Sequence, residues 1–131
     1  IDEFYYRLHE PRRGEIVVFR YPNDPRQYFI KRVIAGPGDR IKVTGGKVTL
    51  FNDENPGGEY LDETSYLGVV FTAGDIDLSL GAGEYFLMGD NRAASLDSRI
   101  FGPVVRSFIV GRVWLRGWPP DKLKLFNEPS S

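Results

Sequence analysis

The feature that most constrains the fold is a series of short apolar runs separated by turn signals at intervals of roughly ten residues. Fifteen Gly and nine Pro punctuate the 131 residues, and no segment shows a helical period longer than two turns. The pattern predicts an all-β, mainly antiparallel fold with little helix. The expected strands are Glu15–Arg20, Tyr28–Ala35, Arg40–Thr44, Lys47–Phe51, Gly68–Thr72, Gly83–Met88 and Ile109–Arg116.

Turn residues define the organisation between these strands. Gly45-Gly46 separates two β-rich runs and predicts a two-residue hairpin, because glycine accepts positive φ at both turn positions. Asn52–Ser65 is rich in Asn, Asp, Pro, Gly and acidic residues, and we expect a loop or insertion there. The length fits one domain, residues 1–131.

Composition excludes several classes of function. Seventeen Lys and Arg against 18 Asp and Glu give a net charge of −1, so no basic field is present to hold nucleic acid. The chain has no Cys, which excludes disulfides and thiolate metal sites. His9 is the one histidine, which leaves little for a His-rich metal site or a Ser-His-Asp triad. No apolar run approaches the length of about 18 residues that a membrane helix needs.

The strand Tyr28–Ala35 carries a cation on each face, Lys31 on one and Arg32 on the other, among apolar neighbours. A lysine in an apolar setting has a lowered pKa and can act as a general base near neutral pH. The alternative is that Lys31 reaches solvent at a sheet edge. Arg32 stays protonated and is expected in a buried ion pair.

A polar block, Gly89–Gly102, follows the apolar strand that ends at Met88. Its Gly-Asp-Asn start is turn chemistry. Ser95, Asp97 and Arg99 are spaced by two, and in an extended chain they share one face, with a hydroxyl beside a carboxylate–guanidinium pair. The alternative is a solvated turn with a surface salt bridge.

Three ordered blocks, Arg13–Phe19, Ile30–Asp39 and Gly89–Gly102, closely resemble type I signal peptidases in sequence and approximate spacing. The last block reads Gly-Asp-Asn-Arg-x-x-Ser-x-Asp-Ser-Arg-x-Phe-Gly and is long and specific. One departure is Ala35-Gly36 before Pro37, where the family more often has Gly followed by an apolar residue.

The resemblance implies a signal-peptidase-like β domain of a membrane-anchored serine endopeptidase that cleaves N-terminal signal peptides from exported preproteins on the extracytoplasmic side. Such enzymes use a Ser-Lys dyad. By position, the resemblance implies Lys31 as general base and Ser95 as the serine that orients it. It also implies two supporting ion pairs, Asp97 with Arg99 and Asp90 with Arg32, and substrate-binding residues Phe29 and Ile30.

The family's nucleophile lies in a Ser-Met-x-Pro block upstream of the region matching Ile1, and none of the seven serines here precedes Met. We therefore expect a fragment truncated at the N-terminus, without nucleophile or anchor, and inactive alone. One alternative is a non-catalytic peptide-binding module of the same fold. Another alternative is a self-cleaving repressor-type peptidase, which also uses a serine and a lysine. It agrees less well with the sequence, because the long block after Met88 belongs to the signal-peptidase pattern.

The resemblance also implies two partners, the signal peptides of preproteins and the membrane lipid surface. Aromatic residues could contact that surface, although packing in the core or at an edge is an equal alternative. We expect no cofactor and no metal, since the acidic residues Asp53, Glu54 and Glu59 lack the spacing of a calcium loop. The aromatic residues in question are Phe4, Tyr5, Tyr6, Trp114 and Trp118.

Overall fold

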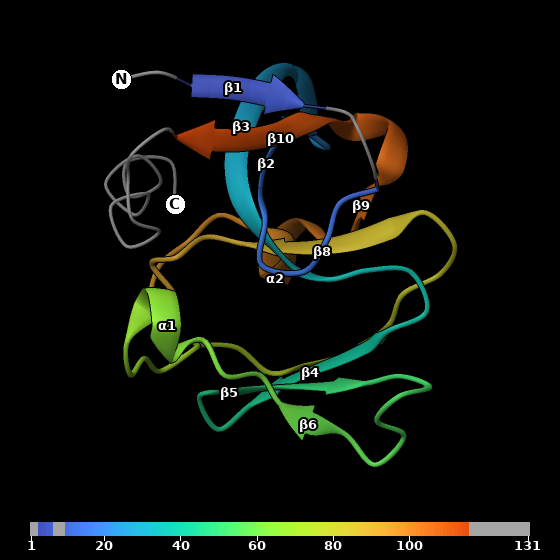
Figure 1. The fold of residues 1–131 in the computed structure, drawn as a ribbon, viewed down its shortest axis with the longest axis vertical. Coiled ribbons are helices and arrows are strands. Elements are labelled where there is room, and N and C mark those ends of the chain that lie inside the picture. Colours follow the sequence, from blue (N-terminus) through green and yellow to red (C-terminus); the bar gives the residue numbers. More distant parts are fainter. Residues whose placement is uncertain (1–2, 7–9, 116–131) are drawn as a thin grey trace.

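The computed structural model describes residues 3–6 and 10–115. In these ranges the chain forms two antiparallel sheets. The larger sheet has six strands in the order β1-β10-β2-β3-β8-β9, and the smaller has four in the order β6-β5-β4-β7. Figure 1 shows the larger sheet above the smaller one, with the strand β3 running down from the first toward the second. The mainly antiparallel β class expected from the sequence is confirmed.

The strands are short, and the helices span only one turn each. The strands are β1 (Glu3–Tyr6), β2 (Ile16–Tyr21), β3 (Asp24–Ala35), β4 (Arg40–Thr44), β5 (Lys47–Phe51), β6 (Glu59–Tyr60), β7 (Ile76–Ser79), β8 (Glu84–Met88), β9 (Val104–Val105) and β10 (Ile109–Leu115). The helices are α1 (Thr64–Leu67), α2 (Ser98–Phe101) and the 3₁₀ helix η1 (Arg106–Phe108).

The central strand β2 of the larger sheet is buried on both faces. Val17 and Phe19 pack into one apolar cluster with residues of β3, β8 and β10. Ile16 and Val18 point to the other face and pack with Val113 of β10. Successive side chains of a strand point to opposite faces, and in β2 both faces are covered. This explains why the run Ile16–Phe19 has no polar residue.

Another apolar cluster lies between the two sheets and joins them. Ile34 and Ala35 at the end of β3, together with Phe86 and Met88 of β8, pack against the smaller sheet. Pro37 and Gly38 then turn the chain into β4, and Gly38 has a φ of +84°. The end of β3 is thus fixed on both sides, which holds the preceding residues of the strand in register. The smaller sheet contributes Ile41, Val43, Val48 and Leu50 to this cluster.

The hairpin predicted at Gly45-Gly46 is confirmed. Thr44 pairs with Lys47, and the two glycines have φ of +60° and +83°. Gly46 carries a second constraint, because a Cβ there would collide with the ring of Phe71. The smaller sheet is therefore closed at this end by the segment that contains Phe71.

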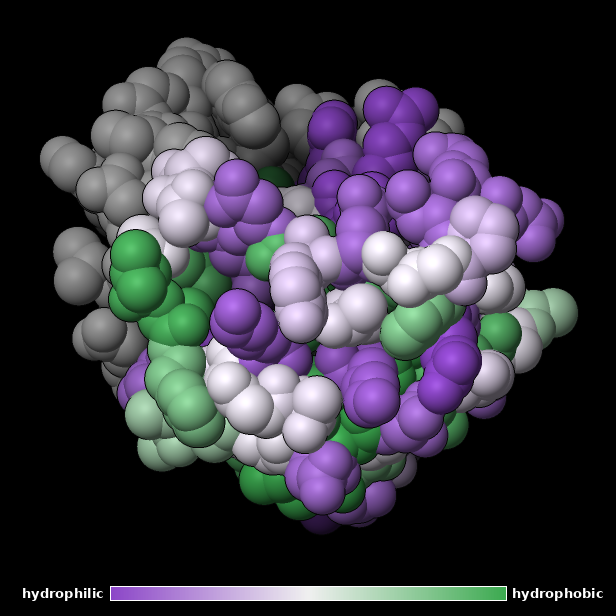
Figure 2. Space-filling view, turned by 90° about the horizontal axis from the view of Figure 1, so that it is seen from below, coloured by the Kyte–Doolittle hydropathy of each residue, from purple (hydrophilic) through white to green (hydrophobic). Residues whose placement is uncertain are grey.

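The prediction of a strand at Gly68–Thr72 is wrong. The segment forms only an isolated bridge between Thr72 and Gly46. The apolar side chains of this segment are exposed and not buried: Val69, Val70 and Phe71 are 98%, 38% and 69% exposed. Figure 2 shows hydrophobic side chains gathered at the left, the side on which Figure 1 places α1.

The other boundaries differ modestly. β3 begins four residues earlier than expected, at Asp24, and β7 was missed although Ile76 and Leu78 alternate with polar residues. Within Asn52–Ser65 the structure places β6 and the start of α1. Of the expected strand Ile109–Arg116, Arg116 lies outside the described residues.

Candidate active site

Lys31 lies in β3 and is fully buried, with 0% of the residue exposed. It pairs with Val17 of β2, and its Nζ lies 5.7 Å from the centre of the Phe29 ring. The alternative in which Lys31 reaches solvent at a sheet edge is therefore wrong for this fold. The neighbouring cation Arg32 is buried as well, at only 3% exposed.

Burial lowers the pKa of Lys31 from 10.5 to about 8. The carboxylates of Asp97 and Asp90 oppose this shift, and the guanidinium of Arg99 adds to it. An amine with this pKa is largely neutral at mildly alkaline pH, which is the state that a general base requires.

Arg32 binds Asp90 through two hydrogen bonds. Its Nε donates to Oδ1 at 3.0 Å and its Nη2 to Oδ2 at 2.8 Å, and a third bond from Nη1 reaches the carbonyl of Gly14. The paired side chains are 4% and 0% exposed. This ion pair joins β3, next to Lys31, to the loop that follows β8.

Asp97 and Arg99 form the second expected pair, with Arg99 Nη2 2.7 Å from Asp97 Oδ2. The geometry differs from the extended strand considered from the sequence, because Asp97 caps α2 and Arg99 lies in that helix. Asp97 also accepts from the backbone N–H groups of Arg99 and Gly89, both at 3.0 Å. These bonds tie the start of α2 to the first residue after β8.

Ser95 lies in the loop between β8 and α2 and is 9% exposed. Its Oγ is buried and makes no hydrogen bond within the described ranges, so the bond to Lys31 implied by the resemblance is not formed. Burying a hydroxyl without a hydrogen-bond partner costs about 1–3 kcal/mol of stability. Ser95 Oγ therefore has hydrogen-bonding capacity that the described residues do not use. Ser95 lines an open hollow of about 270 Å³ together with Ala93, Ala94 and Ile100.

Phe29 and Ile30 are both half-buried in β3 and point to opposite faces. The Phe29 ring stacks on Tyr21 with centres 4.6 Å apart, while Ile30 packs against the cluster of Ile16, Val18 and Val113. Pairing between β3 and β8 begins only at Arg32. In the described part of the chain, β8 therefore does not pair with Phe29, Ile30 or Lys31.

Two buried residues of the polar block received no role from the sequence. Ser98 accepts a hydrogen bond at Oγ from the backbone N–H of Leu87, at 2.9 Å. Arg92 is 2% exposed and binds Glu63. The motif itself was the only signal for these residues, because a single sequence does not show which partner lies 29 positions away.

The rest of residues 3–6 and 10–115 offers no cluster of metal-ligating side chains. No group of three or more His, Cys, Asp or Glu side chains is placed to hold a metal ion there. Nor does that part contain a helix long and apolar enough to cross a bilayer. The side chains of Phe4, Tyr5, Tyr6 and Trp114, and the whole of His9 and Trp118, lie outside what the structure describes.

Comparison with protein families gives a match over residues 1–118 to the model described as signal peptidase, peptidase S26. A probable signal peptidase I-2 of Synechocystis is 35% identical over 134 residues, covering 98% of this chain and 58% of the relative. A signal peptidase I of Leptolyngbya laminosa is 33% identical, covering all of this chain and 64% of the relative. The chain thus spans about three fifths of the length of these relatives.

The fold also matches a solved structure. A crystal structure of a signal peptidase I from Enterococcus faecalis superposes with a TM-score of 0.65 at 24% identity, covering 81% of this chain and 98% of that one. A likeness at this identity supports the fold. Together with the family model, which matches most of the sequence, it leads to one conclusion: the chain belongs to the signal peptidase S26 family.

Proposed function

We propose that this chain is the lysine-bearing β domain of a signal peptidase I that removes N-terminal signal peptides from exported preproteins. The observation that carries the proposal is a fully buried lysine whose pKa lies near 8, beside two ion pairs. Relatives named signal peptidase I support the same activity.

In the proposed reaction, the neutral amine of Lys31 takes the proton of an attacking serine hydroxyl as the serine oxygen adds to the scissile carbonyl. The resulting ammonium gives that proton to the leaving amine when the peptide C–N bond breaks. The acyl-enzyme that remains is hydrolysed when the neutral lysine activates water. Such a step requires no cofactor, only an amine that is unprotonated at working pH.

Ser95 is proposed to orient the Lys31 amine through its hydroxyl. Support comes from its buried Oγ, which lacks a hydrogen-bond partner in the described ranges and so has the capacity to accept from an amine. Asp97 and Arg99 lie two and four residues further along and fix the end of the same loop. Arg32 and Asp90 fix its beginning against β3.

The substrate is proposed to bind as an extended strand along the part of β3 that precedes its pairing with β8, by main-chain hydrogen bonds. Phe29 and Ile30 then flank the cleft on either face and favour small side chains at the −1 and −3 positions of the signal peptide. Stacking on the Tyr21 ring holds the Phe29 ring in place.

The whole protein is proposed to work at a membrane, with this domain on the extracytoplasmic side and the membrane lipid surface as a partner. Support comes from a relative named mitochondrial inner membrane protease subunit 1a of Arabidopsis thaliana, 32% identical over 82% of this chain. The nucleophile is proposed to lie outside these 131 residues, because no serine here precedes Met as the family pattern requires.

The test is preprotein cleavage by the full-length protein of the gene, with Lys31→Ala and this chain compared beside it. We expect cleavage by the full-length protein and loss of at least about a thousandfold in rate with Lys31→Ala, since the base acts in both chemical steps. Lys47→Ala is the matched control, because Lys47 is exposed on the smaller sheet.

Three outcomes would contradict the proposal or part of it. Equal turnover by Lys31→Ala removes the assignment of the base. A folded full-length protein that binds signal peptides without cleaving them identifies a peptide-binding module instead. Cleavage by this chain alone shows that one of its own serines attacks.

A further inference from the structure

Arg92 lies in the loop that carries Ser95, and its guanidinium makes several buried hydrogen bonds. Its Nη1 and Nη2 donate to Glu63 Oε1 and Oε2 at 2.7 and 2.6 Å, and its Nε donates to the carbonyl of Gly89 at 2.8 Å. The Arg92 and Glu63 side chains are 1% and 7% exposed. The guanidinium therefore holds the loop both to itself and to a segment 29 residues earlier in the chain.

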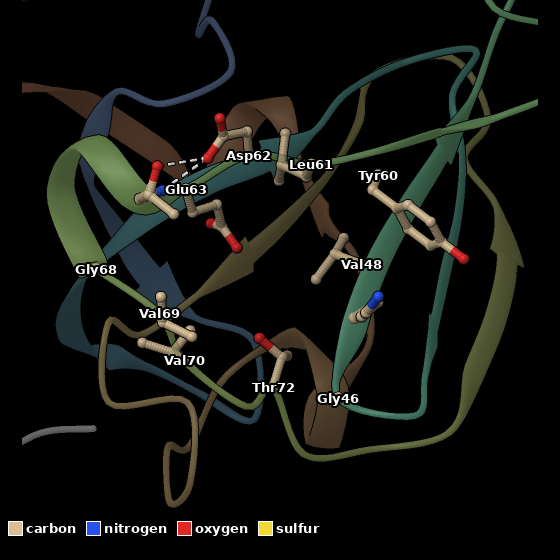
Figure 3. Close-up of a pocket in the computed structure, with 12 residues that line it drawn as sticks. Gly46, Val48, Tyr60, Leu61, Asp62, Glu63, Gly68, Val69, Val70 and Thr72 are labelled. Atoms are coloured by element: carbon tan, nitrogen blue, oxygen red, sulfur yellow. Dashed lines mark hydrogen bonds between the residues drawn. The ribbon is translucent and has the colours of Figure 1, made fainter.

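That earlier segment is the edge of a hollow beneath α1. Arg92 Nη1 also lies 3.3 Å from Thr72 Oγ1, so the guanidinium bridges Glu63 and Thr72. Figure 3 shows the Glu63 carboxylate and the Thr72 hydroxyl on facing sides of this hollow, which has a volume of about 210 Å³. The two ends of the 63–72 segment are thus joined through one arginine of the polar block.

The backbone of Arg92 is held as firmly as its side chain. Its carbonyl accepts from Arg99 Nη1 at 2.7 Å and from the Ala73 N–H at 3.4 Å, and the same Nη1 donates to the Ala73 carbonyl at 2.8 Å. Ser95 lies between two fixed points, Arg92 and the α2 cap Asp97. Only Ala93 and Ala94 separate Ser95 from the first of these points, so the position of Arg92 constrains that of Ser95.

A buried ion pair contributes little net stability, because desolvation offsets the attraction, and an apolar pair of similar volume is often as stable. The best supported benefit of such a pair is that it fixes the two segments it joins in one relative position. The Arg92–Glu63 pair is well suited to that task, since a two-bond guanidinium–carboxylate contact fixes orientation as well as distance.

We propose that Arg92 and Glu63 are positioning residues of the active site, which hold the loop of Ser95 at Lys31 by clamping it to the 63–72 segment. This inference rests on the proposed function of Lys31, and through Glu63 it extends the site beyond the blocks of the family resemblance. The 63–72 segment then acts as a support of the catalytic loop, although no residue of it is placed at the reacting atoms.

The test compares this chain with its Arg92→Met/Glu63→Leu variant, in which no buried charge is left unpaired. Two quantities are measured, the Lys31 pKa by NMR titration of its side chain and the hydrogen-exchange rates of amides 91–96. Loosening of the loop admits water to Lys31, so we expect its pKa to rise by about one unit. Exchange of the loop amides should accelerate by about tenfold, with the unfolding midpoint little changed.

The matched control is Arg40→Gln/Asp77→Asn, which removes an exposed two-bond pair on the smaller sheet and should move neither quantity. Unchanged Lys31 pKa and unchanged exchange in the Arg92→Met/Glu63→Leu variant would overturn the inference and leave the proposed function standing. A Lys31 pKa near 10.5 in the unaltered chain would instead overturn the proposed function. Where the double variant does not fold, Arg92→Lys decides in the same way, since it keeps the charge and loses the second bond.

Discussion

Arg32 of β3 and Asp90 of the loop after β8 face one another as a doubly hydrogen-bonded ion pair, with both side chains almost completely buried. The two residues lie 58 positions apart in sequence. Arg32 directly follows Lys31, and Asp90 begins the loop that leads to Ser95. The pair therefore sets the spacing between the proposed base and the serine proposed to orient it.

Asp90→Asn should destabilise the chain by about 3–5 kcal/mol, because it leaves the Arg32 cation buried without a counter-charge. Urea unfolding of the two proteins measures the difference. The control is Asp77→Asn, which breaks the Arg40 pair at a half-exposed site and should cost under about 1 kcal/mol. Equal losses in the two variants would show that burial of the Arg32–Asp90 pair has no special weight.

Ser95→Ala and Ser98→Ala should have opposite effects on stability, although both remove one buried hydroxyl. Ser95 Oγ has no hydrogen-bond partner within the described chain, so its removal should leave the free energy of unfolding unchanged or raise it by about 1 kcal/mol. Ser98 Oγ accepts from the Leu87 N–H, and its loss should cost about 1–3 kcal/mol. Thermal and urea unfolding measure both. A large loss with Ser95→Ala would mean that its hydroxyl is bonded after all.

The sequence was sufficient wherever the cause of a structure is local. The Gly45-Gly46 hairpin follows from glycine's freedom at positive φ. The strand around Lys31 left two alternatives open, and only the fold shows that the lysine is buried. The long polar block likewise predicted the partners of Asp90 and Asp97, because the resemblance to signal peptidases placed them.

The rest depends on contacts between distant segments. Val69 and Phe71 have the composition of a buried strand, and only the tertiary fold leaves them exposed. The Arg92–Glu63 pair joins the polar block to a segment that the sequence described as a loop. A single sequence provides no way to pair two charges across 29 positions, so this part of the site could not be predicted.

Stability should depend on pH through Lys31, whose folded pKa of about 8 lies below its ordinary value of 10.5. Below pH 8 both states hold the proton and the folded state bears the cost of burying the charge. Between about pH 8 and 10.5 the unfolded chain binds more protons, so the free energy of unfolding rises with pH, by at most about 3 kcal/mol.

The pH effect is isolated by Lys31→Met, which removes the titrating group and keeps the apolar stem. Burial also raises the pKa of Tyr85, which lowers stability at high pH, but this contribution is common to both proteins and cancels in the difference. The difference in free energy of unfolding between Lys31→Met and the unaltered chain should be largest below pH 8 and shrink by pH 10.5. A constant difference would show that Lys31 titrates normally.

Gly46→Ala should destabilise the smaller sheet much more than Gly45→Ala, although both glycines have positive φ. Each substitution places a side chain in the left-handed region, at a cost of about 1 kcal/mol. Only the Cβ of residue 46 meets the Phe71 ring, whereas the Cβ of residue 45 meets open space. Adding Phe71→Ala to Gly46→Ala should therefore recover the extra loss in urea unfolding. Additive losses in this double-mutant cycle would mean that the ring and the turn are independent, and that the bridge at Thr72 alone closes the sheet.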